Sequence, residues 1–140
     1  MNLLDTNVLS EFRKDSYGKA DPCVVAWADS QPIERLFISV ITIFEIEKGA
    51  LLMERRDEKQ GATLRAWIES RLMPAFLGRI IPVDDRVAAL AASLHVPDPA
   101  PFADSLIAAT AIIRGFTIVT RSTRDFQFPG VVVIDPWGFT

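Results

Sequence analysis

The chain has 140 residues, 49% of them hydrophobic and 24% charged, which provides the core of one folded domain and excludes a disordered chain. Fifteen Lys and Arg against eighteen Asp and Glu give a net charge of −3, so nucleic acid is not bound through general basic charge. The single cysteine, Cys23, excludes an intrachain disulfide and a multi-thiolate metal site. With no signal peptide and no apolar run of about 18 residues, we expect a cytoplasmic protein without a membrane segment.

Short apolar runs alternate along the chain with segments of helical periodicity. The runs predict five strands, at residues 3–4, 36–39, 80–83, 117–119 and 131–134. The segments between them predict helices at about 6–13, 22–30, 40–58, 60–77, 84–94 and 102–114. This alternation predicts one α/β domain over residues 1–140, with a central, mostly parallel sheet of about five strands and helices on both faces.

The carboxyl ends of parallel strands share one edge of a sheet, and ligands of open α/β folds bind at that edge. Four separate segments each bring a carboxylate toward it. They are Asp5 after the first predicted strand, Glu45 on the helix after the second, Asp104 in the first turns of the last long helix, and Asp125 after the fourth strand.

Each of these carboxylates, taken singly, also has a structural explanation, which we favour for any one alone. Asp5 suits the N-cap of the first helix, and Glu45 suits a Thr-x-x-Glu capping box with Thr42. Asp104 suits the positive end of a helix dipole, and Asp125 suits a turn. Their conjunction favours a shared site, because carboxylates brought together repel unless protons or a cation neutralise them.

A divalent cation bound by oxygen ligands fits this composition. His95 is the only histidine and there is one cysteine, so the nitrogen and sulfur ligands of a zinc site are missing. Carboxylates, the Asn7 amide and hydroxyl groups suit Mg²⁺ or Mn²⁺. We expect His95 at a loop or helix end and not in catalysis. The chain also lacks the glycine motifs of nucleotide-binding loops and the G-x-S-x-G of serine hydrolases.

Four segments, in order, carry a resemblance to a known family: LLDTNVLSE at 3–11, ISVITIFEIEKGA at 38–50, FADSLIAATA at 102–111 and VTRSTRDF at 119–126. With them the chain resembles the PIN-domain family of metal-dependent ribonucleases, and within it the VapC and FitB-like toxins of bacterial toxin–antitoxin pairs. The resemblance implies a single PIN-like domain and an endoribonuclease toxin that hydrolyses RNA phosphodiester bonds with Mg²⁺ or Mn²⁺.

The resemblance also implies roles for the acidic residues. Asp5, Glu45 and Asp104 match the three regular acidic positions of the family, which are expected to hold the metal directly or, for Glu45, through water. At the place where the family often has Asp or Asn, this chain has Ser122, with Asp125 three residues on. Asp125 is therefore expected to complete the acidic set, while the alternative, in which it only orders the loop, stays open.

Polar and basic neighbours complete the expected site. Asn7, Thr120 and Ser122 are expected to form hydrogen bonds around the metal ligands. Guanidinium and ammonium groups pair with phosphates, although an ordinary solvated surface charge is an equal alternative for each of these cations. The residues expected to contact the RNA backbone are Arg121, Arg124, Arg13 and Lys14.

Two other functions remain open at this point. The first is a phosphatase or phosphotransferase that uses Asp5 as its nucleophile, as haloacid-dehalogenase-like enzymes do. Those enzymes usually carry a second Asp two residues on, where this chain has Asn7. The second is a non-catalytic PIN-like module that binds only protein, to which the serine at position 122 gives some weight.

The resemblance further implies partners. A cognate VapB-like antitoxin and a homodimer are expected, and a larger complex that binds operator DNA through the antitoxin stays open. The segments 43–53 and 64–76 carry apolar residues at helical spacing that could contact another chain. For Trp67 and Phe76 singly, packing within the domain is favoured, and Trp137 is expected to cover the core.

Overall fold

A computed structural model describes all 140 residues and contains a five-stranded, wholly parallel sheet. The strand order is β3-β2-β1-β4-β5, so the chain leaves the central β1 toward one edge and returns to its other side. This confirms the predicted sheet. The strands are β1 (Asn2–Leu4), β2 (Leu36–Ser39), β3 (Ile80–Ile81), β4 (Thr117–Val119) and β5 (Val133–Ile134).

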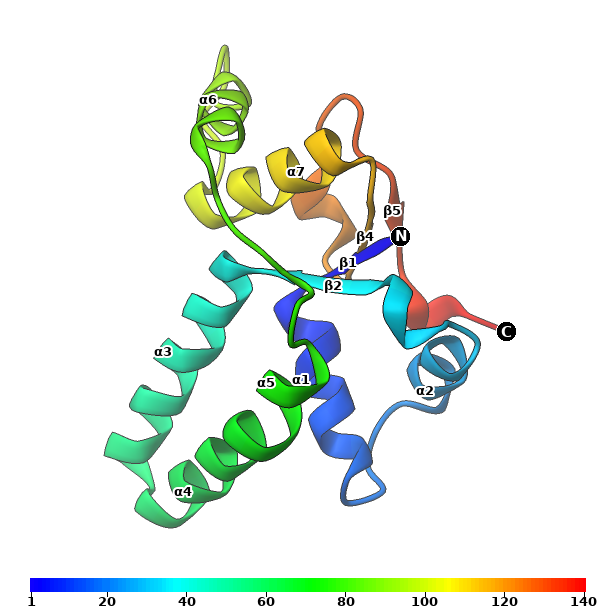
Figure 1. The fold of residues 1–140 in the computed structure, drawn as a ribbon, viewed down its shortest axis with the longest axis vertical. Coiled ribbons are helices and arrows are strands. Elements are labelled where there is room, and N and C mark those ends of the chain that lie inside the picture. The colour runs from blue at the N-terminus through cyan, green and yellow to red at the C-terminus, as the bar shows by residue number, and fades with distance from the viewer.

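Helices cover both faces of this sheet, as Figure 1 shows. α6 and α7 lie on one side, and α1, α3, α4 and α5 lie on the other. No helix has the length and apolarity needed to cross a membrane. The helices are α1 (Thr6–Asp15), α2 (Pro22–Asp29), α3 (Val40–Arg56), α4 (Glu58–Trp67), α5 (Met73–Ala75), α6 (Asp85–Ser93) and α7 (Phe102–Arg114).

The core lies in two layers separated by the sheet. Leu3 and Leu4 are adjacent on β1 and both fully buried, yet they belong to different hydrophobic clusters. Leu4 packs with Leu9 of α1, and Leu3 packs with Ile107 of α7. Successive strand residues point to opposite faces, and both faces are covered, so the strands appear in the sequence as continuous apolar runs.

The predicted helix over residues 60–77 is only partly correct. α4 ends at Trp67, a wider π-helical turn follows at Ile68–Leu72, and α5 then adds a short turn. Pro74 explains the interruption, because proline lacks an amide N–H and its ring clashes with the carbonyl group four residues earlier in a regular helix. Phe76 nevertheless lies in the core, with 4% of its surface exposed, which confirms the predicted packing within the domain.

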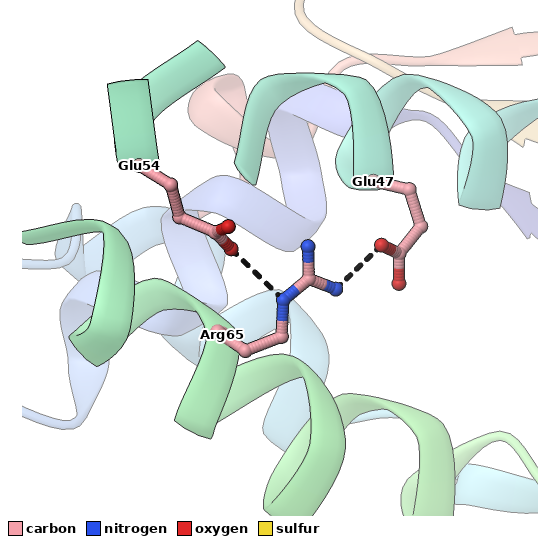
Figure 2. Close-up of polar contacts among 3 residues, drawn as sticks. All are labelled: Glu47, Glu54 and Arg65. Atoms are coloured by element: carbon pink, nitrogen blue, oxygen red, sulfur yellow. Dashed lines mark hydrogen bonds and ion pairs between the residues drawn. The ribbon is translucent and has the colours of Figure 1, made fainter. Parts of the chain in front are cut away.

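The hairpin of α3 and α4 is held by an unusually close crossing and by one arginine. A Cβ atom placed on Gly61 of α4 would lie 2.5 Å from the Cα atom of Glu54 on α3, so only glycine fits there. Beside the crossing, the Arg65 Nη1 donates to Glu47 over 2.5 Å and Nε donates to Glu54 over 3.0 Å (Figure 2). The hairpin is therefore fixed by backbone proximity together with a charged clamp.

We expect the substitution Thr42→Val to raise the free energy of unfolding by about 1 kcal/mol. Thr42 is fully buried on α3 and its hydroxyl oxygen has no hydrogen-bond partner. Valine has a methyl group of about the same size in place of the hydroxyl, so the cost of burying an unpaired hydroxyl is removed while the packing is unchanged. Urea unfolding measures the difference. An unchanged or lower stability would mean that the hydroxyl has a partner.

Candidate active site

The candidate site lies where the strand order reverses, between β1 and β4. Asp5 directly follows β1, and its backbone N–H donates to the carbonyl oxygen of Val119 at the end of β4, over 2.9 Å. Thr120 continues from β4 and is fully buried beside it. The two strand ends that carry polar residues are thus neighbours at the switch point of an open α/β sheet, the usual place for a ligand.

The Asp5 side chain is held by two donors and is 9% exposed. Its Oδ1 accepts a hydrogen bond of 2.8 Å from the backbone N–H of Thr6, and Oδ2 accepts one of 2.7 Å from the Thr120 hydroxyl. Asp5 is also the N-cap of α1, so its structural explanation holds as well. As N-cap, the Asp5 carboxylate lies at the carboxyl end of β1, where it can also bind a ligand.

Glu45 is tied to the same place by a residue that sequence reasoning missed. The Thr6 hydroxyl donates a hydrogen bond of 2.9 Å to the Oε1 of Glu45 and so connects α1 with α3. The predicted capping box of Glu45 with Thr42 is wrong, because α3 begins earlier, with Ser39 as N-cap accepting from the backbone N–H of Ile41. The position of Thr6, directly after Asp5 in the first turn of a helix, was the available signal.

The negative charges of the other three acids act on the pKa of Asp104. Asp104 is the third residue of α7, and burial contributes most to raising its pKa from 3.8 to about 6, followed by the charge of Asp125. Asp5 and Glu45 shift it in the same direction. Burial likewise raises the pKa of Glu45, against the hydrogen bond from Thr6, and the charge of Asp5 adds to the rise. Charges shift one another's pKa in this way only when they lie close together, so the four predicted acids lie near one another.

These acids do not form a finished coordination shell. No group of three or more Asp, Glu, His or Cys side chains is gathered closely enough to hold a metal ion as it stands. Two of the acids are held by other partners, Asp5 by Thr6 and Thr120 and Glu45 by Thr6. The donor set nevertheless fits a hard cation such as Mg²⁺, which keeps several of its waters and needs only one or two direct carboxylate ligands.

The predicted polar neighbours form one connected network. The Asn7 amide nitrogen donates to the hydroxyl oxygens of Thr120 and Ser122, each over 3.2 Å. The backbone N–H of Ser122 donates to the Thr120 hydroxyl over 3.0 Å, and the backbone N–H of Arg121 donates to the Asn7 oxygen over 3.3 Å. Through Thr120 the network reaches Asp5, so these side chains orient an acid.

The four predicted RNA-contacting cations are placed very differently. Arg121 and Arg124 are exposed near Asp125, and Arg13 is half-buried in a groove beside Glu45. Lys14 donates instead to the buried carboxylate of Glu11 over 3.2 Å. Glu11 also accepts a hydrogen bond from the backbone N–H of Asp21, so the Lys14 ammonium group already has a structural partner.

A groove of about 240 Å³ leads away from the site. It starts at Thr6 and Glu45 and passes between α1 and α3 toward α4. Arg13, Met53 and Trp67 line it and also line a second pocket, so the two pockets adjoin on the surface. Trp67 is half-exposed and lines the groove, so only part of its side chain packs against the core.

The comparisons with known proteins agree with this geometry. A family model described as PIN domain matches residues 3–129. The chain belongs to the PIN-domain family. The predicted family and the PIN-like α/β fold are thereby confirmed, and the match spans both strand ends and all four acids of the candidate site.

Close relatives of this PIN domain match along its whole length. VapC ribonuclease Y4jK of Sinorhizobium fredii is 37% identical over 145 residues, covering 98% of each chain. Toxin FitB of Neisseria gonorrhoeae is 38% identical over 143 residues, covering 98% of this chain and 99% of FitB. The crystal structure of FitAcB from Neisseria gonorrhoeae matches 99% of this chain and 100% of its own, with a TM-score of 0.87 and 36% identity.

The raised pKa of Asp104 predicts how the metal-free PIN domain responds to pH. Its pKa is higher in the folded protein than its usual value of 3.8, so the folded state binds the proton more tightly than the unfolded state does. The contribution of Asp104 to stability is therefore fully present below pH about 4 and is lost as pH rises through about 6. Thermal unfolding in EDTA measures this loss.

Two controls accompany the pH measurement. Mg²⁺ or Mn²⁺ should restore more stability at pH 7 than at pH 5, because the ionised carboxylate is the form that binds a cation. The variant Asp104→Asn should have a flatter profile than the wild type. Identical pH profiles for the wild type and Asp104→Asn between pH 4 and 7 would contradict the raised pKa of Asp104.

Proposed function

We propose that this PIN-domain protein is a metal-dependent endoribonuclease, the toxin component of a type II toxin–antitoxin system, that hydrolyses RNA phosphodiester bonds. The observation that carries the proposal is the grouping of four carboxylates near the switch point, where burial and then the charges of the other three acids raise the pKa of Asp104 to about 6. The names of the relatives, a VapC ribonuclease and toxin FitB, support the same activity.

The acids are proposed to hold Mg²⁺ or Mn²⁺. Asp5 and Asp104 would bind it directly, Glu45 through water, and Asp125 would complete the negative field. A divalent ion held by these acids would lower the pKa of a water molecule and stabilise charge on the phosphoryl oxygens. Asp125 is preferred to Ser122 for this role because its charge is, after burial, the largest cause of the raised Asp104 pKa.

The residues around the acids are proposed to orient them. Thr120 fixes one oxygen of Asp5 by its hydroxyl hydrogen bond, and Thr6 fixes one oxygen of Glu45. Asn7 holds the hydroxyl groups of Thr120 and Ser122 in place. Both oxygens of Asp5 and one oxygen of Glu45 are therefore already oriented by hydrogen bonds, which preorganises these two acids for the charge that develops on the phosphate.

RNA is proposed to lie across the exposed side of the site. Arg121 and Arg124 are free to pair with phosphates there, and Arg13 is placed to do so along the groove. Lys14 is the weakest candidate because of its bond to Glu11. An RNA substrate also implies that the protein acts in the cytoplasm.

Cleavage assays with purified protein test this proposal. Single-stranded RNA should be cleaved with Mg²⁺ or Mn²⁺ and left intact in EDTA. Release of phosphate from small monoesters, with RNA untouched, would instead support a phosphatase that uses Asp5 as nucleophile. RNA left intact under all metal and sequence conditions would support a non-catalytic protein-binding module.

The fourth acidic position has its own prediction. We expect Asp125→Ala to weaken Mn²⁺ binding about three- to tenfold through the loss of a nearby charge, while Ser122→Ala changes it by less than about twofold. Isothermal titration of the two variants beside the wild type measures both. A loss confined to the serine variant would show that Ser122, and not Asp125, serves the metal.

Partners are proposed from the same relatives. Solved structures include FitAB bound to an IR36 DNA fragment, whose matching chain has 36% identity and a TM-score of 0.87 with this one. We infer a VapB-like antitoxin, a toxin homodimer, and operator DNA contacted through the antitoxin. The groove lined by Arg13, Met53 and Trp67 offers the antitoxin a place beside Glu45. Co-expression with the adjacent small reading frame and copurification tests this.

A further inference from the structure

The Arg121 side chain contacts the Trp137 ring beside the candidate site. Arg121 lies between Thr120 and Ser122, whose side chains belong to the network around Asp5. Its guanidinium carbon lies 5.2 Å from the ring centroid of Trp137, within the range of a cation–π contact. An exposed arginine otherwise samples many rotamers, so this contact selects one of them.

Trp137 is itself firmly held. It lies in a 3-10 turn, Pro136–Gly138, that follows β5, and its backbone N–H donates to the Oδ1 of Asp135 over 2.9 Å. Pro136 is buried, and the half-buried Trp137 ring packs against the core cluster that contains Leu4. The ring therefore offers Arg121 a fixed surface that is anchored in the core.

The contact with Trp137 leaves the hydrogen-bonding capacity of the Arg121 side chain unused. A guanidinium group meets an aromatic ring with its flat face, while its N–H donors point outward from the edge. The ion pairs of the structure involve Lys14 and Arg65, and none involves Arg121. Held on the ring, Arg121 keeps its edge available for an outside anion.

We propose that Trp137 is a positioning residue that holds Arg121 at the rim of the site, where its guanidinium edge binds a phosphate of single-stranded RNA next to the bond to be cleaved. The inference rests on the proposed ribonuclease function. Bidentate pairing with phosphate and stacking on the ring occur together, because one uses the edge and the other the face of the same group. The ring also keeps the arginine from turning back to neutralise the acids.

A double-mutant cycle tests this inference through RNA binding. Fluorescence anisotropy follows a short labelled single-stranded RNA in EDTA, in an Asp104→Asn background that lowers the negative charge of the site. Arg121→Gln should reduce the slope of log affinity against log salt by about 0.7, the value for one phosphate on a single strand. Trp137→Leu should weaken binding about two- to fivefold.

The combined variant distinguishes positioning from direct contact. If Trp137 acts through Arg121, Trp137→Leu adds nothing once Arg121 is replaced by Gln. Additive losses would show that the indole binds RNA itself, by base stacking, and would overturn the inference. So would an unchanged affinity of Trp137→Leu, or an Asp104→Asn protein that binds no RNA.

Two further measurements exclude a merely structural effect. The Trp137→Phe variant keeps an aromatic face and should recover most of the affinity lost in Trp137→Leu. The NMR signals of the Arg121 side chain should be shifted upfield by the indole ring and should move toward ordinary values in Trp137→Leu. Because binding is measured without cleavage, a negative result here is distinct from a failure of the proposed ribonuclease activity, which the metal-dependent cleavage assay reports.

Discussion

Asp104→Asn is expected to lower the rate of RNA cleavage at least about a hundredfold. It is also expected to make the metal-free protein more stable at pH 7. Both effects have one cause. Asp104 is half-buried near Asp125, Asp5 and Glu45, and no hydrogen bond to its carboxylate offsets the repulsion. The amide removes the charge that destabilises the empty site and, with it, the charge that would attract a metal.

Cleavage rates with Mn²⁺ and thermal unfolding in EDTA measure the two effects in the same preparations. Asp98→Asn is the matched control, because Asp98 is exposed in the loop that leads to α7 and lies outside the acidic cluster. It should keep both the activity and the stability of the wild type. An Asp104→Asn protein that is less stable than wild type in EDTA would show that Asp104 is structural.

Gly61→Ala is expected to lower the free energy of unfolding by about 1–3 kcal/mol. A methyl group at this position would meet backbone atoms of Glu54, with the Cα atom at 2.5 Å, so α4 would have to move away from α3. The gain of about 1 kcal/mol that alanine brings in a helix does not offset this clash. Displacement of α4 would also disturb Trp67 and the groove.

Gly49→Ala on α3 is the matched control for the crossing. Its added Cβ meets nothing within 4 Å, so helix propensity alone should stabilise the protein, by about 0.5–1 kcal/mol. Urea unfolding of both variants gives the comparison. If Gly61→Ala proved as stable as Gly49→Ala, the helices would not cross as closely as described.

Most of the sheet could be predicted because both of its faces are buried. Continuous apolar runs, such as those containing Leu3 and Ile118, marked the strands within one or two residues, except that β3 and β5 are shorter than predicted. The grouping of Asp5 with Thr120 followed from parallel strand direction alone. Chain topology thus brought distant segments together without any knowledge of side-chain contacts.

Contacts between elements were beyond the reach of sequence patterns. The hydrogen bond from Thr6 to Glu45 joins residues 39 positions apart, and the contact of Arg121 with Trp137 joins two loops. The start of α3 at residue 40 was predicted correctly, but its N-cap was not, because Ser39 and Thr42 are both acceptable caps by residue type and only the backbone decides between them. The tight crossing at Gly61 likewise depends on how two helices dock.

The most direct test of this account is a crystal grown with Mn²⁺ and measured for anomalous scattering. We expect a peak at the switch point between β1 and β4, about 2.2 Å from carboxylate oxygens of Asp5 and Asp104, with water toward Glu45. A well-ordered protein with no Mn²⁺ there, or with these carboxylates turned in unrelated directions, would contradict the claim that the four acids form one metal site.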